Sequence, residues 1–346
     1  RGFIPKRSRF VPFSIIVFLL CLAFGKALFS RTSSESNNTF DHGLSRRKRM
    51  MRPTVLARPV FVAAVAAALL CTCGLPVSEA GPITPGNLVI YRVGSGSNAL
   101  ANTGNNVFLD EYTTTGSLVQ SIEMPSTGVD TKLISAGSSF HEGPMSISSD
   151  GKWIGFAGYN STISATSSLP NGSSTLYPRV AGIFNTTSGS YSLTVTGTFF
   201  SQTNARGVAT TDGNKIWANG GNSGIVYGTV DGSSPFVASG TTAATALIGT
   251  NNRVLGIFGN ELYQTSASGT VGTVALLTGA IANGLPSAST ALPDIPRQGG
   301  SPVTSRFGFV FLDINPSVAG VDTMYTVDES DTSGGIWKYS LDSSGT

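Results

Sequence analysis

The sequence predicts an all-β fold built from short antiparallel strands, and three observations support this prediction. Residues 81–346 are rich in Ser, Thr and Gly and carry few charged side chains. Ser and Thr compete for the hydrogen bonds of a helix backbone, and Gly costs about 1 kcal/mol relative to Ala inside a helix. Short clusters of Val, Ile, Leu, Phe, Tyr and Trp recur between Gly-containing turns, as is typical of strands. The pairs Asp150-Gly151 and Asp212-Gly213 each lie between two such clusters, which is the pattern of a tight β-hairpin.

The first 80 residues differ in charge from the rest of the chain. They hold 12 of the 22 Lys and Arg residues but only 3 of the 19 Asp and Glu residues. Residues 81–346 are therefore acidic, although the whole chain has a formal net charge of +3. Neutralisation of phosphates by Lys and Arg supplies most of the affinity of proteins that bind nucleic acid. We expect no nucleic-acid partner.

Residues 50–80 have the three-part layout of a secretory signal peptide. A short basic region after Met50 is followed by the apolar run PVFVAAVAAALLCTCGL, and Ser78 and Ala80 are the small residues before a cleavage site at Gly81. The run is too short and too rich in Ala for a membrane span, which needs about 20 apolar residues. A retained anchor is the alternative. We expect a secreted, extracellular protein with no stable membrane span after the signal peptide is removed.

Residues 1–49 form an upstream segment that we do not expect in the mature protein. This segment has its own apolar stretch after a basic start, and translation from Met50 would leave it out. A basic processing site at the run RRKR, in a longer precursor, is a competing interpretation.

The predicted mature domain has no cysteine, and hence no disulfide and no Cys-ligated metal, because all three cysteines lie in the leader segments: Cys21, Cys71 and Cys73.

A two-strand unit recurs within residues 81–346: an apolar strand, a polar turn with Gly, and a second alternating strand. Its five copies are centred on the turn glycines Gly116, Gly189, Gly232, Gly269 and Gly345. Further strand pairs lie between the copies, and each inner pair combined with its outer pair gives a four-stranded antiparallel unit. The two intervals between Gly189, Gly232 and Gly269 match a β-propeller blade of roughly 40 to 50 residues. Longer intervals carry the insertions NSTISATSSLPNGSSTLYP and TGAIANGLPSASTALPDIPRQGGSP.

These repeats predict a β-propeller of four-stranded antiparallel blades, with a β-sandwich or a β-solenoid as the alternative. The run GNLVIYRVGSGSNALANTGNNVFLDEYTTTGSLVQSIEMP, followed by HEGPMSISSDGKWIGFAGY and NARGVATTDGNKIWANGG, resembles a family of secreted, largely uncharacterised seven-bladed β-propeller proteins. The resemblance covers most of residues 86–346. It implies seven blades, of which about five are present, so that residues 81–346 would be an incomplete propeller domain truncated at its C-terminus. The strand NLVIYRV would then lack its ring-closing partner; a complete, smaller propeller is the alternative.

Residues suited to catalysis are scarce in the predicted domain. His141 is its single histidine, which excludes a two-His metal site, so we predict no catalytic residue and no metal ligand. His141, Glu142, Asn204 and Arg206 precede or begin the inner strands of two successive blades, and such segments gather at one mouth of a propeller's channel. They form a candidate binding site, with Glu142 as a hydrogen-bond acceptor or metal ligand and Arg206 as an anchor for carboxylate or phosphate. The favoured alternative is an inter-blade ion pair between Glu142 and Arg206 that seals the mouth.

The acidic loop Asp328-Glu329-Ser330-Asp331 offers oxygen ligands of the kind that calcium prefers. It lacks the spacing of an EF-hand loop, so we predict no cofactor, and we favour a solvated loop over a calcium site.

Three sequons would be N-glycosylation sites in a eukaryotic host if their loops are exposed: Asn160, Asn171 and Asn185.

The function we expect is that of a secreted or cell-surface β-propeller acting as a non-catalytic binding or matrix-interaction module. Its partner would be an extracellular carbohydrate or protein, held by Ser- and Gly-rich loops on a rigid scaffold. The alternative is an extracellular propeller-type hydrolase or lactonase. This alternative requires acidic residues and His141 to converge at the channel mouth around a divalent cation, so the sequence leaves the enzyme question open, with a non-enzyme favoured.

Overall fold

The computed structural model describes residues 80–239, 250–267, 274–292, 306–329 and 334–341. The predicted upstream segment and all but the last residue of the predicted signal peptide lie outside these ranges. Within the described residues the regular structure consists of strands β1 to β19 and one short helix, α2 (Ala280–Asn283). The predicted all-β class is confirmed.

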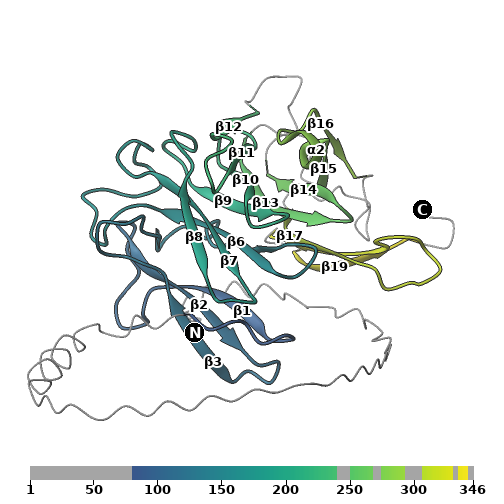
Figure 1. Cartoon of the computed structure of the whole chain (residues 1–346), viewed down its shortest axis with the longest axis horizontal. Helices are drawn as coiled ribbons and strands as arrows, with labels where there is room; N and C mark the ends of the chain where they lie inside the picture. The colour runs from purple at the N-terminus through teal and green to yellow at the C-terminus, as the bar shows by residue number, and fades with distance from the viewer. Residues whose placement is uncertain (1–79, 240–249, 268–273, 293–305, 330–333, 342–346) are drawn as a thin grey trace, which may run out of the picture. The chain divides into compact units, whose positions relative to one another are not determined.

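The strands form five antiparallel units that follow one another along the chain (Figure 1). The first unit is β1 (Leu88–Val93), β2 (Asn105–Tyr112) and β3 (Leu118–Glu123). The second is β5 (Ser146–Ile147), β6 (Trp153–Tyr159), β7 (Arg179–Asn185) and β8 (Tyr191–Val195). The third is β9 (Ala205–Thr210), β10 (Lys215–Gly220), β11 (Val226–Thr229) and β12 (Val237–Ala238). The fourth is β13 (Asn252–Phe258), β14 (Glu261–Ser266), β15 (Val274–Thr278) and β16 (Ala288–Ala291), and the fifth is β17 (Arg306–Leu312), β18 (Thr323–Asp328) and β19 (Gly335–Ser340).

Two predicted hairpins are present, each with its glycine in the left-handed region. Gly151 joins β5 to β6 at a φ of 72°, and Gly213 joins β9 to β10 at a φ of 80°. This left-handed conformation costs glycine little because it has no Cβ. The Asp-Gly signal therefore located both inner hairpins correctly.

The fourth unit corrects the predicted arrangement of strand pairs. The hairpin expected around Gly269 was assigned to the outer pair, but the strands on either side of it, β14 and β15, are the second and third strands of the sheet. Gly269 itself lies outside the described residues. The outermost strand, β16, falls inside the segment that we interpreted as an insertion, and α2 leads into it. Its sequence, ASTA, has no large apolar residue to mark it as a strand.

The strand NLVIYRV also has a well-defined place in the structure. It forms β1, which pairs antiparallel with β2 from the Leu88–Tyr112 pair to the Val93–Val107 pair. The short strand β4 (Ile134–Ser135) then links the first two units, because it pairs with both β2 and β6. Whether β1 would also close a ring with a further blade stays a prediction.

The hydrophobic core is divided into clusters that lie between successive units. One cluster joins strands of the first and second units, the next joins the second and third, and the same holds for the third with the fourth and the fourth with the fifth. The sheets therefore stack face to face in chain order. Three of the five units are four-stranded, and such stacking of antiparallel sheets is the packing of β-propeller blades. The predicted fold class is confirmed.

Two glycines allow neighbouring sheets to approach closely. A Cβ on Gly155 of β6 would lie 2.5 Å from the carbonyl oxygen of Val208 on β9. A Cβ on Gly207 of β9 would lie 2.7 Å from the backbone nitrogen of Leu255 on β13. The units are thus in backbone contact where the inner strands meet.

Candidate functional site

The predicted site residues lie where the first strands of the units begin. Strands β5, β9 and β13 all contact one another, and β17 contacts β13, so these first strands converge. Glu142 lies in the segment before β5, Asn204 directly precedes β9, and Arg206 is the second residue of β9. The structure brings these three side chains together.

Glu142 is buried, and both oxygens of its carboxylate are occupied. Oε2 accepts hydrogen bonds from Oγ of Ser135, at 2.8 Å, and from the backbone nitrogen of Ala136, at 2.9 Å. Oε1 accepts from the hydroxyl of Tyr159, at 2.7 Å, and from Nδ2 of Asn204, at 3.4 Å. Burial raises the pKa of Glu142 despite these hydrogen bonds. Four donors use the carboxylate's acceptor capacity, so Glu142 acts within the fold rather than as a ligand acceptor.

Arg206 is also buried and held by several partners. Its Nε donates to Oδ1 of Asn204, at 2.9 Å, and its Nη1 donates to Oδ1 of Asn251, at 2.7 Å, and to the carbonyl of Asn252, at 3.0 Å. Burial, reinforced by the charge of Arg253, lowers the pKa of Arg206 to about 10. The guanidinium therefore connects the start of β9 to the start of β13.

The Asn204 amide stands between Glu142 and Arg206. It donates to the carboxylate through Nδ2 and accepts from the guanidinium through Oδ1. Within the described residues, no ion pair links Glu142 directly to Arg206. The direct ion pair expected from the sequence is thus replaced by a neutral bridge, while the expectation that these residues join neighbouring units at the inner-strand starts agrees with the structure.

Arg253 and Glu329 extend this network and were missed as site residues in the sequence. Arg253 is the second residue of β13, the same position that Arg206 holds in β9, and this repetition was the available signal. Its Nη1 pairs with Oε1 of Glu329, which follows β18. The Arg253 side chain is 6% exposed and that of Glu329 is 29% exposed.

The acidic loop differs from its expected solvated state. Asp328 is the last residue of β18 and is buried, while Glu329 is engaged by Arg253. Ser330 and Asp331 lie outside the described residues. Across the described ranges, no three His, Cys, Asp or Glu side chains gather as a metal site would require.

His141 lies beside this network and close to two aromatic rings. Its ring centroid is 4.1 Å from that of Phe140 and 6.0 Å from that of Phe307, which it stacks against at 20°. Burial, followed by the charges of Arg206 and Arg253, lowers the pKa of His141 to about 4. The imidazole is therefore neutral at pH 7, and its buried Nε2 has no hydrogen-bond partner among the described residues.

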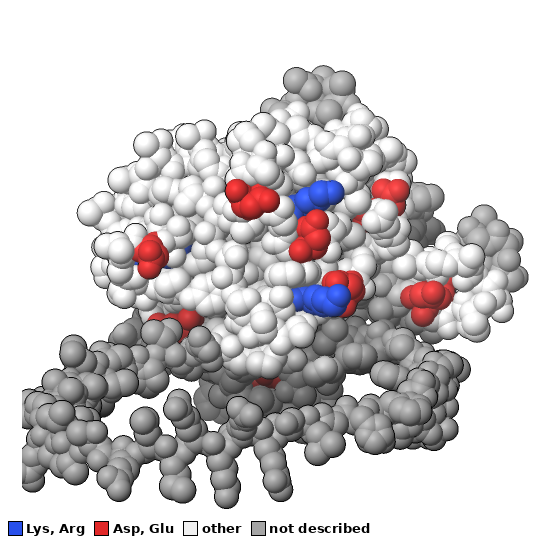
Figure 2. Space-filling model, viewed as in Figure 1, with Lys and Arg blue, Asp and Glu red and all other residues white. Residues whose placement is uncertain are grey.

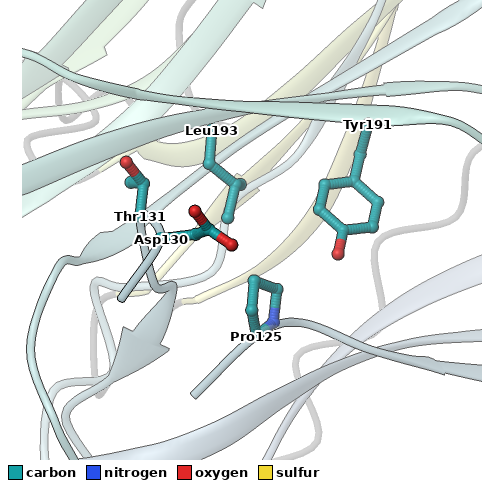
Figure 3. A pocket seen from close by; sticks show the side chains of 5 residues that line it. All are labelled: Pro125, Asp130, Thr131, Tyr191 and Leu193. Carbon is teal, nitrogen blue, oxygen red and sulfur yellow. The ribbon is translucent and has the colours of Figure 1, made fainter. Parts of the chain in front are cut away.

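A separate hollow opens between the first two units, away from the inner-strand starts. It has a volume of about 420 Å³ and is lined by Pro125, Asp130, Thr131, Tyr191 and Leu193 (Figure 3). Tyr191 and Leu193 belong to β8, and the other three belong to the segment between β3 and β4. None of these five was singled out in the sequence, because they lie apart in the chain and match no motif.

The three sequons differ in accessibility. Asn171 is exposed, whereas Asn160 and Asn185 are partly buried. Oδ1 of Asn160 accepts a hydrogen bond from the backbone nitrogen of Lys132, at 3.0 Å, and Oδ1 of Asn185 accepts from that of Thr187, at 2.8 Å. Glycosylation at any of them stays a prediction.

Charged side chains are sparse on the visible face of the molecule, where acidic groups are interspersed with a few basic ones (Figure 2). No helix within the described ranges has the length and apolar character that crossing a membrane requires.

Comparisons with known proteins give structural matches only. No family model and no curated protein sequence matches the chain. A protein of unknown function from Bacteroides thetaiotaomicron is 11% identical, with 71% of this chain and 54% of that chain covered, at a TM-score of 0.38. A prolyl endopeptidase is 18% identical, with 73% and 31% covered, at a TM-score of 0.35. The periplasmic gluconolactonase of Pseudomonas aeruginosa is 10% identical, with 75% and 69% covered, at a TM-score of 0.35.

The chain spans about half the length of the first of these structures and about a third of the prolyl endopeptidase. At such low identities and TM-scores the matches say nothing about activity. The assignment of the fold rests on the stacked sheets themselves, and function has to be inferred from the sites.

Proposed function

We propose that the protein is a secreted or cell-surface binding module, non-catalytic, that holds an extracellular carbohydrate or protein at the starts of its inner strands. The observation that supports this is the environment of His141. The Phe140 ring lies against the imidazole and is itself 59% exposed. Beside it, Nε2 of His141 and Nε of Arg253 are buried without a hydrogen-bond partner among the described residues. Buried polar atoms are nearly always paired in folded proteins, so two such atoms behind an exposed ring favour a site that a ligand completes.

The chemistry of these groups favours a ligand that bears a carboxylate. Arg253 offers a charged donor, and the neutral imidazole of His141 offers a further polar contact. The sequence assigned the anchoring role to Arg206, but Asn204, Asn251 and Asn252 occupy its Nε and Nη1. Arg253 pairs with Glu329 through Nη1 and keeps Nε without a partner among the described residues, so it is the better anchor. An acidic polysaccharide or an acidic protein side chain fits this arrangement, with Phe140 as the exposed contact surface.

A hydrolase or lactonase at the same place would need a carboxylate that is free to act as a base or to hold a cation. Glu142 has four hydrogen-bond donors, and Glu329 pairs with Arg253. Within the described residues no observation favours this second function, so the binding role is the one we retain.

The test is calorimetric titration of the purified chain with hexagalacturonate, and with maltohexaose as an uncharged control. We expect hexagalacturonate to bind at this site, and we expect the heat of maltohexaose addition to be the same for the wild type and for Phe140→Ala. Phe140→Ala and His141→Gln should each weaken hexagalacturonate binding at least fivefold, and raised salt should weaken it further because the anchor is ionic. Val237→Ala removes an exposed side chain on β12 and should change nothing. Unaltered binding in Phe140→Ala would contradict the proposal.

A further inference from the structure

We infer that the hollow between β8 and the segment before β4 is a second binding site, which takes a neutral pyranose unit of an extracellular polysaccharide. This inference does not depend on the site around His141. Tyr191 and Leu193 extend from β8 on one side of the hollow, and Pro125 lies on the opposite side with the Asp130 carboxylate between them (Figure 3). Its volume is about 420 Å³, and it is open to solvent on one side, as suits one unit of a longer polysaccharide.

The polar groups that line the hollow are available to a ligand. Within the described residues the Asp130 carboxylate and the hydroxyls of Thr131 and Tyr191 make no hydrogen bond. The carboxylate can accept from two sugar hydroxyls, and the two protein hydroxyls can both donate and accept. A polyhydroxylated ligand is the class of molecule that uses all three groups together.

The apolar groups suit the faces of a sugar ring. The Tyr191 ring is 40% exposed at the edge of the hollow, and the Pro125 ring lies across from it. Leu193 packs against the core below, so the floor is apolar and supported from beneath. Tyrosine combines a large apolar surface with a polar tip, which matches the apolar face and the hydroxyl rim of a pyranose.

The walls of the hollow are held in place before a ligand arrives. The backbone nitrogen of Leu133 donates to the carbonyl of Pro125, at 2.8 Å, which ties together the two ends of the segment that carries Asp130 and Thr131. On the other side, Tyr191 pairs with Phe184 in the β7–β8 ladder. A preformed site loses less conformational entropy when it binds.

The charge within the hollow disfavours anionic ligands. Asp130 is the charged residue that lines it, and its carboxylate repels uronic acids and phosphates. A neutral sugar avoids this repulsion, so this hollow and the site around Arg253 are expected to prefer different saccharides.

The experiment uses the full chain with four neutral hexasaccharides, cellohexaose, maltohexaose, mannohexaose and xylohexaose, and with a lysine pentapeptide. Saturation-transfer NMR detects binding, and calorimetry gives the dissociation constant. We expect at least one hexasaccharide to bind, Tyr191→Ala to weaken it at least tenfold, and Asp130→Ala to weaken it about threefold to tenfold. Tyr191→Phe keeps the ring and should lose less than Tyr191→Ala.

Two control variants separate this site from the one around His141. Phe140→Ala and Val237→Ala should both leave hexasaccharide binding unchanged, because neither residue lines the hollow. The inference is overturned if none of the four hexasaccharides binds, if Tyr191→Ala binds as the wild type does, or if the lysine pentapeptide binds in their place. Loss of hexagalacturonate binding in Phe140→Ala, with hexasaccharide binding intact, would show that the two sites are independent.

Discussion

Arg253 on β13 and Glu329 after β18 form an ion pair that joins the fourth unit of the fold to the fifth. The guanidinium also lies over the Phe307 ring, with 5.5 Å between Cζ and the ring centroid. Removing one partner of a buried pair leaves a charge without compensation, whereas removing both costs much less.

Glu329→Gln should therefore lower the free energy of unfolding by about 2 kcal/mol, because Arg253 would stay buried near the like charge of Arg206. This expected loss of unfolding free energy is smaller than the loss for a fully buried ion pair, because Glu329 is partly exposed. Urea denaturation measures the change. The double variant Arg253→Met/Glu329→Gln should recover at least half of the loss, and a double variant less stable than Glu329→Gln would contradict this account.

Asn204→Ala should destabilise the protein by about 3 kcal/mol, because it deprives buried Arg206 of one partner and Glu142 of another. The same denaturation measurement applies. Asn214→Ala is the matched control, since its side chain bonds only to Asp231 at an exposed position, and it should cost less than 1 kcal/mol. If Asn204→Ala and Asn214→Ala lose the same unfolding free energy, the Asn204 amide has no special role between Glu142 and Arg206.

Arg179 organises the insertion at residues 160–178 from inside the fold. Its fully buried guanidinium donates to the backbone carbonyls of Tyr177, Gly172 and Thr203, among others. Arg179→Lys keeps the charge but loses the planar set of donors. We expect a loss of about 2 kcal/mol in unfolding free energy and faster chymotrypsin cleavage within 160–178, identified by mass spectrometry. Cleavage at the wild-type rate would contradict this role.

Arg92→Lys is the control for that experiment. Arg92 pairs with Asp110 while its own side chain is 35% exposed, so the substitution should leave the proteolysis of residues 160–178 unchanged. The comparison separates a general loss of stability from a local release of the insertion.

His141 should make the fold less stable as the pH falls below neutrality. Its pKa in the folded state is about 4, below the ordinary value of 6.5, because burial and the charges of Arg206 and Arg253 oppose protonation. The unfolded chain takes up the proton first, so stability is fully present above pH 6.5 and is lost as the pH falls toward 4. Between pH 7 and pH 5 the wild type should lose about 1 kcal/mol more than His141→Gln, after allowance for the solvent exposure of the ring.

Thermal unfolding of both proteins at pH 7 and pH 5 checks the prediction for His141. Glu142 acts in the opposite sense, because its raised pKa removes stability as the pH rises, but this contribution is common to both proteins and cancels in the comparison. If His141→Gln loses as much stability between pH 7 and pH 5 as the wild type does, the prediction is contradicted.

The strand pattern was the most predictable part of the molecule. Asp150-Gly151 and Asp212-Gly213 marked hairpins because Asp-Gly between two apolar runs favours a tight turn, in which Gly takes a positive φ at little cost. The β15–β16 pair was missed because ASTA in β16 has no apolar alternation, and only its pairing with β15 makes it a strand.

The sequence predicted that Glu142 and Arg206 lie near each other at the starts of inner strands, and the structure joins them through Asn204. That these residues form a binding site stays a prediction. No spacing rule indicates that an amide will stand between them, that Arg253 will take its partner from Glu329, or that Tyr191 and Asp130 will line one hollow. These contacts depend on how sheets stack, and they join residues far apart in the chain.

The sequence by itself determined the all-β class, the repeating antiparallel units and the sparse charge of the domain, because hairpins and strand alternation are local properties. The tertiary structure alone decided which polar groups are used up inside the fold and which remain available. Glu142 and Arg206 were the obvious charged candidates, yet stacking surrounds them with partners. Phe140, Tyr191 and Asp130 carried no motif, yet the fold leaves them exposed, since the burial of a side chain is set by what packs against it and not by its own segment.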